Sequence, residues 1–352
     1  MPRFKSFASM TDGVLPPNAA NARLAPRPDA GSNPGKLPML AYVPAALPPR
    51  APLVVVLHGC TQTAGGYDDA SGWSTLADKH GFALLYPEQA RANNANGCFN
   101  WFEPGDTARG SGEVASIAAA VAAMVRDHDL DPARVFVTGL SAGGAMATTL
   151  LATYPDVFAG GAICAGLPFG SADSVGAALG AMRTPPERDG QALGDRVRAA
   201  SSFTGPWPRV AIWHGTADAT VSPANGDAVA AQWCDVHGLE ASKAVISGSA
   251  RDSVRRWRSA SGVVQVELHR VDGMGHGTPI TAGRDGAHAA PFMLDVGVDA
   301  AGAACAFWGI ADASAKVTPL RPRAAEPVRA AHAGFDVGGV INAALKAAGL
   351  MR

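Results

Sequence analysis

The stretch Val135-Phe-Val-Thr-Gly139-Leu-Ser141-Ala-Gly143-Gly144 decides the fold of this chain. Its first residues are β-branched or aromatic, which favours a buried strand, and residues 143–153 have the apolar pattern of a helix. A serine between glycines at a strand-to-helix junction is typical of a nucleophile elbow, a strained turn that holds Ser141 Oγ in the open. The alternative interpretation is a glycine-rich turn in which Ser141 only caps the helix.

Other apolar runs extend this pattern along the chain. They are short and continuous, as expected for strands buried on both faces of a parallel sheet, and they cover residues 53–57, 82–86, 161–164 and 210–213. Helical patterns over 113–128, 143–153 and 224–236 lie between several of them. The alternation predicts an α/β protein with one doubly wound, mostly parallel sheet. The chemistry is expected just past the carboxyl ends of its strands.

The composition of the remaining segments predicts the domain organisation. Residues 1–36 lack periodicity and are expected to form an irregular leader to a catalytic domain over 37–313. Within that domain, residues 166–205 break the alternation and are interpreted as an insertion bordering the active site. Residues 314–352 are predicted to be a linker and a C-terminal helix over 336–348. A helix of this length is marginal alone, so it is expected to dock on its own domain or on a second copy in a homo-oligomer.

Two later motifs supply partners for the serine. Asp218 ends the stretch His214-Gly-Thr-Ala-Asp218, directly after a predicted strand, and His276 lies in Gly273-Met-Gly-His276-Gly277, after a strand pattern over 263–271. Their simpler interpretations are a turn-forming aspartate and a solvent-facing loop histidine. The order Ser141, Asp218, His276 is that of α/β-hydrolases and differs from the orders of chymotrypsin and subtilisin. The sequence therefore predicts a catalytic triad of these three residues.

The stretch Leu57-His58-Gly59-Cys60-Thr61-Gln62 follows the first strong strand. A turn here would direct the Cys60 N–H toward a substrate oxygen, and the Ala142 N–H would be the second donor of an oxyanion hole. Gly59 and Gln62 are expected to border the substrate. Cys60 as a thiol nucleophile is the weaker interpretation, because Cys60 has no elbow.

Three aromatic groups are candidates for the substrate pocket: Trp101-Phe102, Pro168-Phe169 and Phe307-Trp308. If Trp101, Phe169 and Trp308 line the site, the pocket is apolar and mostly uncharged, as ligand sites usually are. The alternative is that these aromatics are core residues. No cofactor and no metal site are predicted, because the chain has neither phosphate-cradle spacing nor a His/Cys/Asp cluster with ligand spacing.

Charge and hydropathy exclude several classes of partner. Lys and Arg number 29 and Asp and Glu number 30, so a net charge of -1 leaves no electrostatic footprint for nucleic acid or an anionic membrane. The chain has no apolar run of about 18 residues, so no transmembrane helix is predicted. Residues 1–10 have no continuous apolar core, and no signal peptide is predicted. The expected partner is therefore a small molecule or oligomer rather than a nucleic acid or a membrane.

Five motifs together resemble the short-chain polyhydroxyalkanoate (PHB) depolymerase family of esterases, which is related to bacterial feruloyl and acetylxylan esterases. The likeness covers roughly residues 37–310 and rests on residues 57–62, 98–102, 139–144, 214–218 and 273–277. It implies a serine carboxylesterase that works through an acyl-enzyme on short 3-hydroxyalkanoate esters or oligomers, with a feruloyl or acetylxylan esterase as the alternative. It also suggests an extracellular location.

The resemblance further implies a disulfide between Cys60 and Cys98, against the alternative of two buried small hydrophobic side chains. The sequence has no threonine-rich linker followed by a polymer-binding domain, so soluble oligomers or small esters are expected rather than crystalline polymer. Two rivals stay open. A peptidase of the same fold would need a subsite for the peptide, and an inactive hydrolase fold could serve as a binding module.

Overall fold

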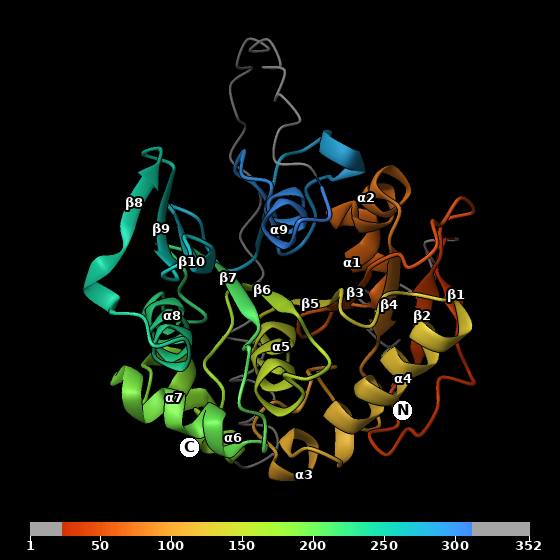
Figure 1. The fold of residues 1–352 in the computed structure, drawn as a ribbon, viewed down its shortest axis with the longest axis horizontal. Coiled ribbons are helices and arrows are strands. Elements are labelled where there is room, and N and C mark those ends of the chain that lie inside the picture. The colour runs from red at the N-terminus through yellow and green to blue at the C-terminus, as the bar shows by residue number, and fades with distance from the viewer. Residues whose placement is uncertain (1–22, 312–352) are drawn as a thin grey trace, which may run out of the picture.

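The buried apolar runs form the centre of a ten-stranded sheet in the computed structural model, which describes residues 23–311 (Figure 1). Six strands run parallel in the order β4-β3-β5-β6-β7-β10. Their bounds are Leu53–Leu57 (β3), Ala83–Pro87 (β4), Val135–Leu140 (β5), Gly160–Cys164 (β6), Arg209–Gly215 (β7) and Val264–Val271 (β10). The doubly wound α/β sheet predicted from the alternation is confirmed.

Antiparallel strands extend both edges of the sheet. On the β4 side lie β2 (Met39–Tyr42) and β1 (Ala25–Pro26), and on the β10 side lie β9 (Asp252–Arg258) and β8 (Val245–Gly248). The expectation of an irregular leader over 1–36 is therefore wrong at β1. A two-residue strand is too short to carry a period-two pattern, so only its pairing with β2 reveals it.

Helices cover both faces of the sheet (Figure 1). One face carries α4 (Gly112–Asp127), α5 (Ala142–Thr153) and α8 (Ala224–Val236), and the other carries α1 (Ala64–Ser71), α2 (Trp73–His80) and α9 (Ala300–Trp308). Successive strand residues point to opposite faces, so Val55 packs in one core and Val54 in the other. Both valines are 0% exposed, which explains why the strands read as continuous apolar runs.

The pair α1 and α2 was not predicted from the sequence. Each helix has eight residues, and Gly72 ends the first and begins the second with a left-handed φ of 78°. Thr63 accepts a hydrogen bond from the Gly66 N–H and so caps α1. Two helices of about two turns give too few repeats for a helical period to stand out.

The segment interpreted as an insertion contains α6 (Val175–Arg183) and α7 (Gly190–Ala199). The shorter elements are α3 (Pro104–Thr107), two 3₁₀ turns at Ala241–Lys243 and Arg284–Gly286, and the parallel pair β11 (Thr278–Ile280) and β12 (Met293–Asp295). None of the helices described within residues 23–311 has the length and apolar character needed to cross a bilayer. The predicted helix over 336–348 lies outside the described residues.

Candidate active site

Ser141 lies at the sharp turn between β5 and α5, with φ 56° and ψ -117°. A non-glycine residue rarely adopts a positive φ, and such strain is found where the surrounding structure imposes it. The turn is fixed from both sides, because the Ser141 N–H donates to the carbonyl of Cys164 on β6 and the Ser141 carbonyl accepts from Ala145 in α5. The observed geometry is that of the predicted nucleophile elbow.

Gly143 is required by the close approach of α5 to the neighbouring strand. A Cβ atom at this position would collide with the backbone carbonyls of Leu57 and His58 at the end of β3. Because Gly143 has no side chain, the helix N-terminus lies against the loop that follows β3. This brings Ser141 and the predicted oxyanion loop together.

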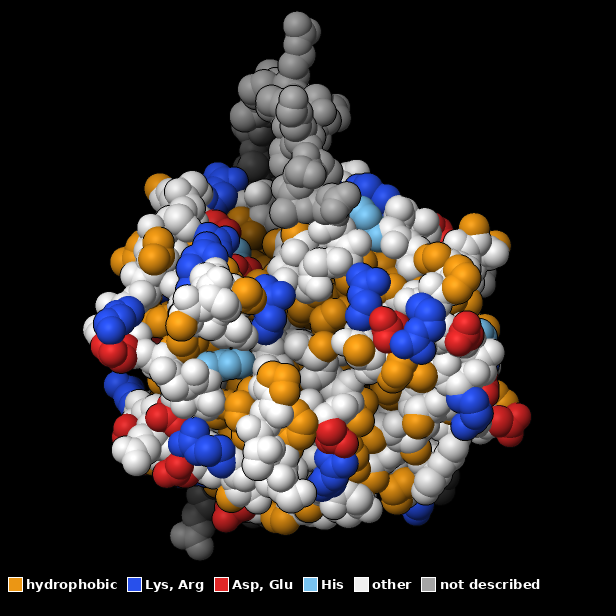
Figure 2. Space-filling model, in the orientation of Figure 1, with side chains coloured by type: hydrophobic (Ala, Val, Ile, Leu, Met, Phe, Trp, Pro, Cys, Tyr) orange, Lys and Arg blue, Asp and Glu red, His pale blue; other side chains and the backbone are white. Residues whose placement is uncertain are grey.

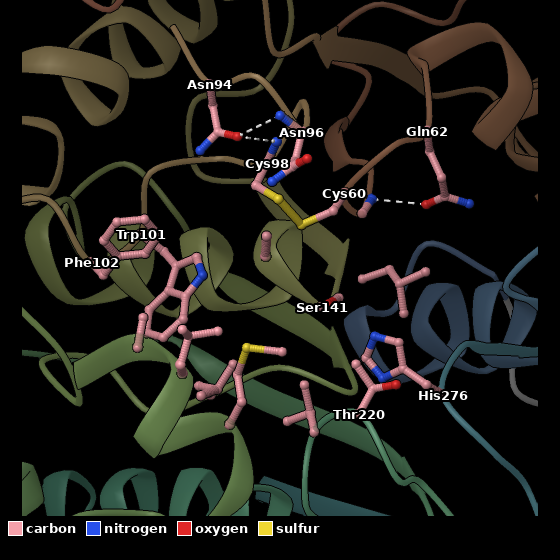
Figure 3. Close-up of a pocket in the computed structure, with 18 of the residues that line it drawn as sticks. Cys60, Gln62, Asn94, Asn96, Cys98, Trp101, Phe102, Ser141, Thr220 and His276 are labelled. Atoms are coloured by element: carbon pink, nitrogen blue, oxygen red, sulfur yellow. Dashed lines mark hydrogen bonds between the residues drawn. A yellow bond between two sulfur atoms is a disulfide. The ribbon is translucent and has the colours of Figure 1, made fainter. Parts of the chain in front are cut away.

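His276 and Asp218 meet at the ends of two neighbouring parallel strands. Asp218 follows β7 and His276 follows β10, and the two loops are joined where the Ala217 N–H donates to the Met274 carbonyl at 3.0 Å. His276 Nδ1 lies 2.8 Å from Asp218 Oδ2. The ring of His276 lies beside Ser141 at the edge of one pocket (Figure 3). The three predicted triad residues are thus brought together by three different strand ends.

The Asp218 carboxylate is held in its charged form. Its side chain is 0% exposed, and its Oδ1 accepts hydrogen bonds from the backbone N–H groups of Thr220 and Val221, each at 2.9 Å. Burial alone would raise the pKa of Asp218, but the interactions with His214 and His276 outweigh it and hold the pKa well below its ordinary value. Asp218 can therefore orient His276 and stabilise the imidazolium that forms during catalysis.

Two residues beside Ser141 line the pocket and have a free backbone N–H among the described residues. Cys60 and Ala142 both line the pocket, and neither N–H has a hydrogen-bond partner within residues 23–311. Ala142 is the first residue of α5, so its N–H also carries the positive end of the helix dipole. Two such donors beside the serine are what an oxyanion hole requires.

The loop that presents Cys60 is held by Gln62 and His58. Gln62 Oε1 accepts from the Gly59 N–H at 2.8 Å, and its Nε2 donates to the Pro291 carbonyl at 3.3 Å. His58 Nδ1 donates to the Gly59 carbonyl at 2.8 Å, while Nε2 accepts from the Gln89 N–H at 3.0 Å. Gly59 and Gln62 line the pocket as predicted, but the Gln62 amide is engaged in shaping the loop.

Glu113 supports the loop that presents Cys60 through Gln89, whose N–H binds His58. Glu113 was not singled out from the sequence. It is fully buried in the first turn of α4 and accepts hydrogen bonds from the Gln89 side chain and from the Asn100 N–H. Burial raises the pKa of Glu113 to about 8. A sequence feature could have indicated this role: Glu113 is a carboxylate at the start of an apolar helix, and Gln89 follows the end of a predicted strand.

A disulfide joins Cys60 to Cys98, as the resemblance implied, while Cys164, Cys234 and Cys305 are free and buried. It connects the oxyanion loop to the segment that carries Trp101 (Figure 3). A hydrogen bond joins the same two segments: the Thr61 N–H donates to the Asn96 carbonyl at 2.9 Å. The alternative, in which Cys60 and Cys98 are two buried thiols, is wrong in this structure.

The double variant Cys60→Ser/Cys98→Ser is expected to unfold more easily, because the bridge closes a loop with a sequence separation of 38. For a loop of this length the chain-entropy argument gives a loss of about 4 kcal/mol in the free energy of unfolding. Urea titration with and without reductant measures it: reductant should lower wild-type stability and leave the double variant unchanged. Cys234→Ala, which removes a free thiol, is the control that keeps the response to reductant. Five titratable thiols in the denatured, unreduced wild type would contradict the bridge.

The pocket over Ser141 has an apolar wall and a polar rim (Figure 3). Trp101, 8% exposed, lies in this wall with its ring at 89° to that of Phe102. The helix α6 supplies Val175, Ala178, Leu179 and Met182, none of which was proposed from the sequence. Other lining residues missed there are Asn94, Asn96, Leu140, Leu167, Thr220, Val221 and Phe292. Leu140 is the last residue of β5, next to Ser141, and the others lie in loops at distant points of the chain, so no local pattern marks them.

Two predicted substrate contacts are wrong. Trp308 lies on α9, on the opposite face of the sheet, where it stacks on Phe136 at 4.9 Å and on Trp73 at 6.2 Å between ring centroids. Phe169 does not line the pocket: its side chain packs against the core, and the buried Gln232 side chain of α8 binds its backbone N–H and carbonyl. These two aromatics are packing residues, which was the alternative considered for them.

Charge is sparse and mixed around the site. The described residues that line the pocket include no Lys, Arg, Asp or Glu. Figure 2 shows acidic and basic side chains interspersed on the face that it presents. No group of three or more His, Cys, Asp or Glu side chains within residues 23–311 is arranged to hold a metal ion. The groups available for chemistry here are the hydroxyl, the imidazole, the carboxylate and the two N–H donors.

The strand order, the elbow and the Ser141, His276 and Asp218 arrangement define a serine hydrolase of the α/β-hydrolase class. The sequence model of the family described as esterase PHB depolymerase matches residues 38–256. The chain belongs to this family of carboxylic-ester hydrolases.

Similar proteins agree with this assignment. The chain is 46% identical over 273 residues to poly(3-hydroxyalkanoate) depolymerase C of Paucimonas lemoignei, covering 76% of this chain and 66% of that protein. It is 34% identical over 261 residues to an acetylxylan esterase of Coprinopsis cinerea, covering 71% and 67%. The chain thus matches about two thirds of the length of each relative. Among solved structures, an acetyl xylan esterase from Aspergillus awamori superposes with a TM-score of 0.70 at 25% identity, covering 82% of this chain and 99% of that one.

Proposed function

We propose that this chain hydrolyses carboxylic esters through an acyl-enzyme on Ser141, and that its substrates are short 3-hydroxyalkanoate esters or oligomers. The observation that carries the proposal is the convergence of three parts on one apolar pocket. They are a serine on a strained elbow, an imidazole hydrogen-bonded to a buried carboxylate, and two backbone N–H groups without a hydrogen-bond partner in residues 23–311.

Each part has a defined task in the reaction. His276 takes the proton of the Ser141 hydroxyl as the oxygen attacks the acyl carbonyl. The negative charge that develops on the carbonyl oxygen is stabilised by the N–H groups of Cys60 and Ala142. The protonated His276 then gives its proton to the departing alcohol. Water, activated by the same imidazole, attacks the acyl-enzyme and releases the acid.

The lining of the pocket supports a short, branched acyl group that carries one polar oxygen. The α6 side chains, with Leu167 and Phe292, offer an apolar surface for short alkyl groups. Asn96 lies on the rim, and within residues 23–311 its side-chain amide has no hydrogen-bond partner. Such an amide can bind a hydroxyl or an ester oxygen. The lining residues described within 23–311 include no Lys or Arg, which disfavours substrates with free carboxylates or phosphates near the scissile bond.

A feruloyl or acetylxylan esterase is the second candidate. Relatives and the superposed structure carry these names, and the perpendicular Trp101–Phe102 pair could contact an aromatic acyl group. A peptidase or an inactive binding module fits less well, because the site has the elements of an esterase and none of the described residues that line the pocket is charged and able to hold a peptide terminus.

The expected substrate order tests the choice between the two esterase candidates. We expect higher kcat/KM for 3-hydroxybutyrate dimers and trimers, and for short-chain p-nitrophenyl esters, than for methyl ferulate or acetylated xylan. Initial rates on this panel, with an amide panel as the control for peptidase activity, measure it. A tenfold preference for ferulate, about 1.4 kcal/mol of transition-state discrimination, would replace the substrate proposal and leave ester hydrolysis standing.

A further inference from the structure

His214 is a fully buried histidine next to the candidate triad, and the mechanism above does not use it. Its side chain is 0% exposed at the end of β7, four residues before Asp218. Its Nε2 lies 2.9 Å from the Val221 carbonyl oxygen and 3.4 Å from Asp218 Oδ2. Its Nδ1 has no partner among the described residues. The ring hydrogen is therefore assigned to Nε2, which faces two acceptors.

The turn over 218–221 closes around the Asp218 carboxylate. The N–H groups of Thr220 and Val221 bind Oδ1, and His276 binds Oδ2. Val221 thus has two partners. Its N–H donates to the Asp218 carboxylate, and its carbonyl accepts from His214. His214 therefore holds Val221, the residue that in turn binds the triad aspartate, and it also lies near the oxygen that orients His276.

We propose that His214 is a positioning residue for ester hydrolysis, which fixes the 218–221 turn around Asp218 and shares the charge of Oδ2 with His276. This inference rests on the proposed function. In a buried site an N–H dipole near Oδ2 reduces the charge that the carboxylate directs at His276. Without that dipole the imidazolium form of His276 is favoured. The acid limb of the pH–rate profile, where His276 must be deprotonated to act as base, then moves to higher pH.

Other charged groups face His214 from the elements packed against it. Arg270 pairs with His214 in the register of β10 and β7, and it forms an ion pair with Asp227 of α8. Asp227 also pairs with Arg255 of β9. Because this cluster lies close by, Asp227→Asn is the control for long-range electrostatic effects on the profile.

The experiment compares three substitutions of His214 in the full chain. His214→Leu keeps the bulk and loses the N–H, and we expect kcat to fall about tenfold with KM within about twofold, the loss of one buried hydrogen bond. His214→Gln carries an amide N–H that reaches the Val221 carbonyl and should recover most of kcat and the wild-type acid limb. His214→Asn is too short to reach it and should behave like His214→Leu.

A second buried histidine controls for stability. His269 is stacked on Trp213 and bound to Asp252 and Glu267, away from the pocket, so His269→Leu should lower stability without moving the acid limb. If His214→Leu keeps kcat within twofold of wild type and an unmoved acid limb, or if His214→Gln is impaired as much as His214→Leu, His214 is only a packing residue and the inference is overturned.

The rate at which a fluorophosphonate labels Ser141 can be measured without knowing the natural ester. It tests the proposed function and the role of His214 separately. A wild type that does not label overturns the proposed function. A wild type that labels, with His214→Leu labelling equally fast, overturns only the role of His214. Slower labelling of His214→Leu than of His214→Gln supports it.

Discussion

Ser141→Ala is expected to lower ester turnover by about 10⁴-fold or more, because the covalent route is lost while the pocket and both N–H donors remain. The β-carbon is kept, so the elbow and α5 should fold as in the wild type. His276→Ala should be nearly as severe. The double variant should be no worse than the worse single variant, since the two groups act in one step. Initial rates on p-nitrophenyl butyrate measure these effects.

Ser171→Ala is the matched control for the serine. The Ser171 hydroxyl is buried, lies outside the pocket lining and has no hydrogen-bond partner among the described residues, so its removal should leave turnover unchanged. Fluorophosphonate labelling followed by peptide mapping should locate the adduct at Ser141. More than a tenth of wild-type activity in Ser141→Ala would show that another group is the nucleophile.

Asp218→Asn is the second large effect, with an expected loss of about 10⁴-fold in kcat. Asp218 Oδ1 is bound by two backbone N–H groups, so the amide oxygen of the variant will take that position. The amide NH₂ then faces His276 Nδ1, so Nδ1 must accept a hydrogen bond from the amide instead of donating one to a carboxylate. The ring hydrogen moves to Nε2, and His276 can no longer take the proton of Ser141.

The pH dependence of stability gives an independent measure of Asp218. Its pKa in the folded chain lies below its unfolded value, so its stabilising contribution is complete above the unfolded pKa of about 4 and is lost as pH falls through the lower folded value. The difference in unfolding free energy between wild type and Asp218→Asn should therefore shrink as pH falls below about 4.

Asp227→Asn is the control for this second variant. It removes a strongly ion-paired, half-exposed carboxylate and does not touch the triad, so its turnover should stay within about twofold of wild type. Unfolding by urea at several pH values and initial rates at each pH are the measurements. An Asp218→Asn enzyme with more than a tenth of wild-type kcat would contradict the assigned tautomer.

The sequence by itself determined the elements whose signals are local. The run at 135–144 predicted both the strand and the elbow, and the valine-rich run at 53–57 predicted a strand buried on both faces. The triad candidates followed because the carboxyl ends of parallel strands share one edge of a sheet. Six strands, including the one over 263–271, three helices and all three triad candidates were predicted in this way, since a short run contains the whole signal.

Only the tertiary structure decided which distant segments meet. Trp101 and Trp308 were both candidates for the pocket. Because α9 packs on the face of the sheet opposite α5, Trp308 lies in the core and Trp101 is the one of the two that lines the pocket. The wall formed by α6, the position of the Asn96 amide on the pocket rim and the contact of His214 with Val221 likewise depend on how loops fold over the sheet. The physical reason is that strand, helix and turn patterns reflect the conformation of neighbouring residues. The face on which a helix packs, and the partner that a buried polar atom finds, depend on the whole chain.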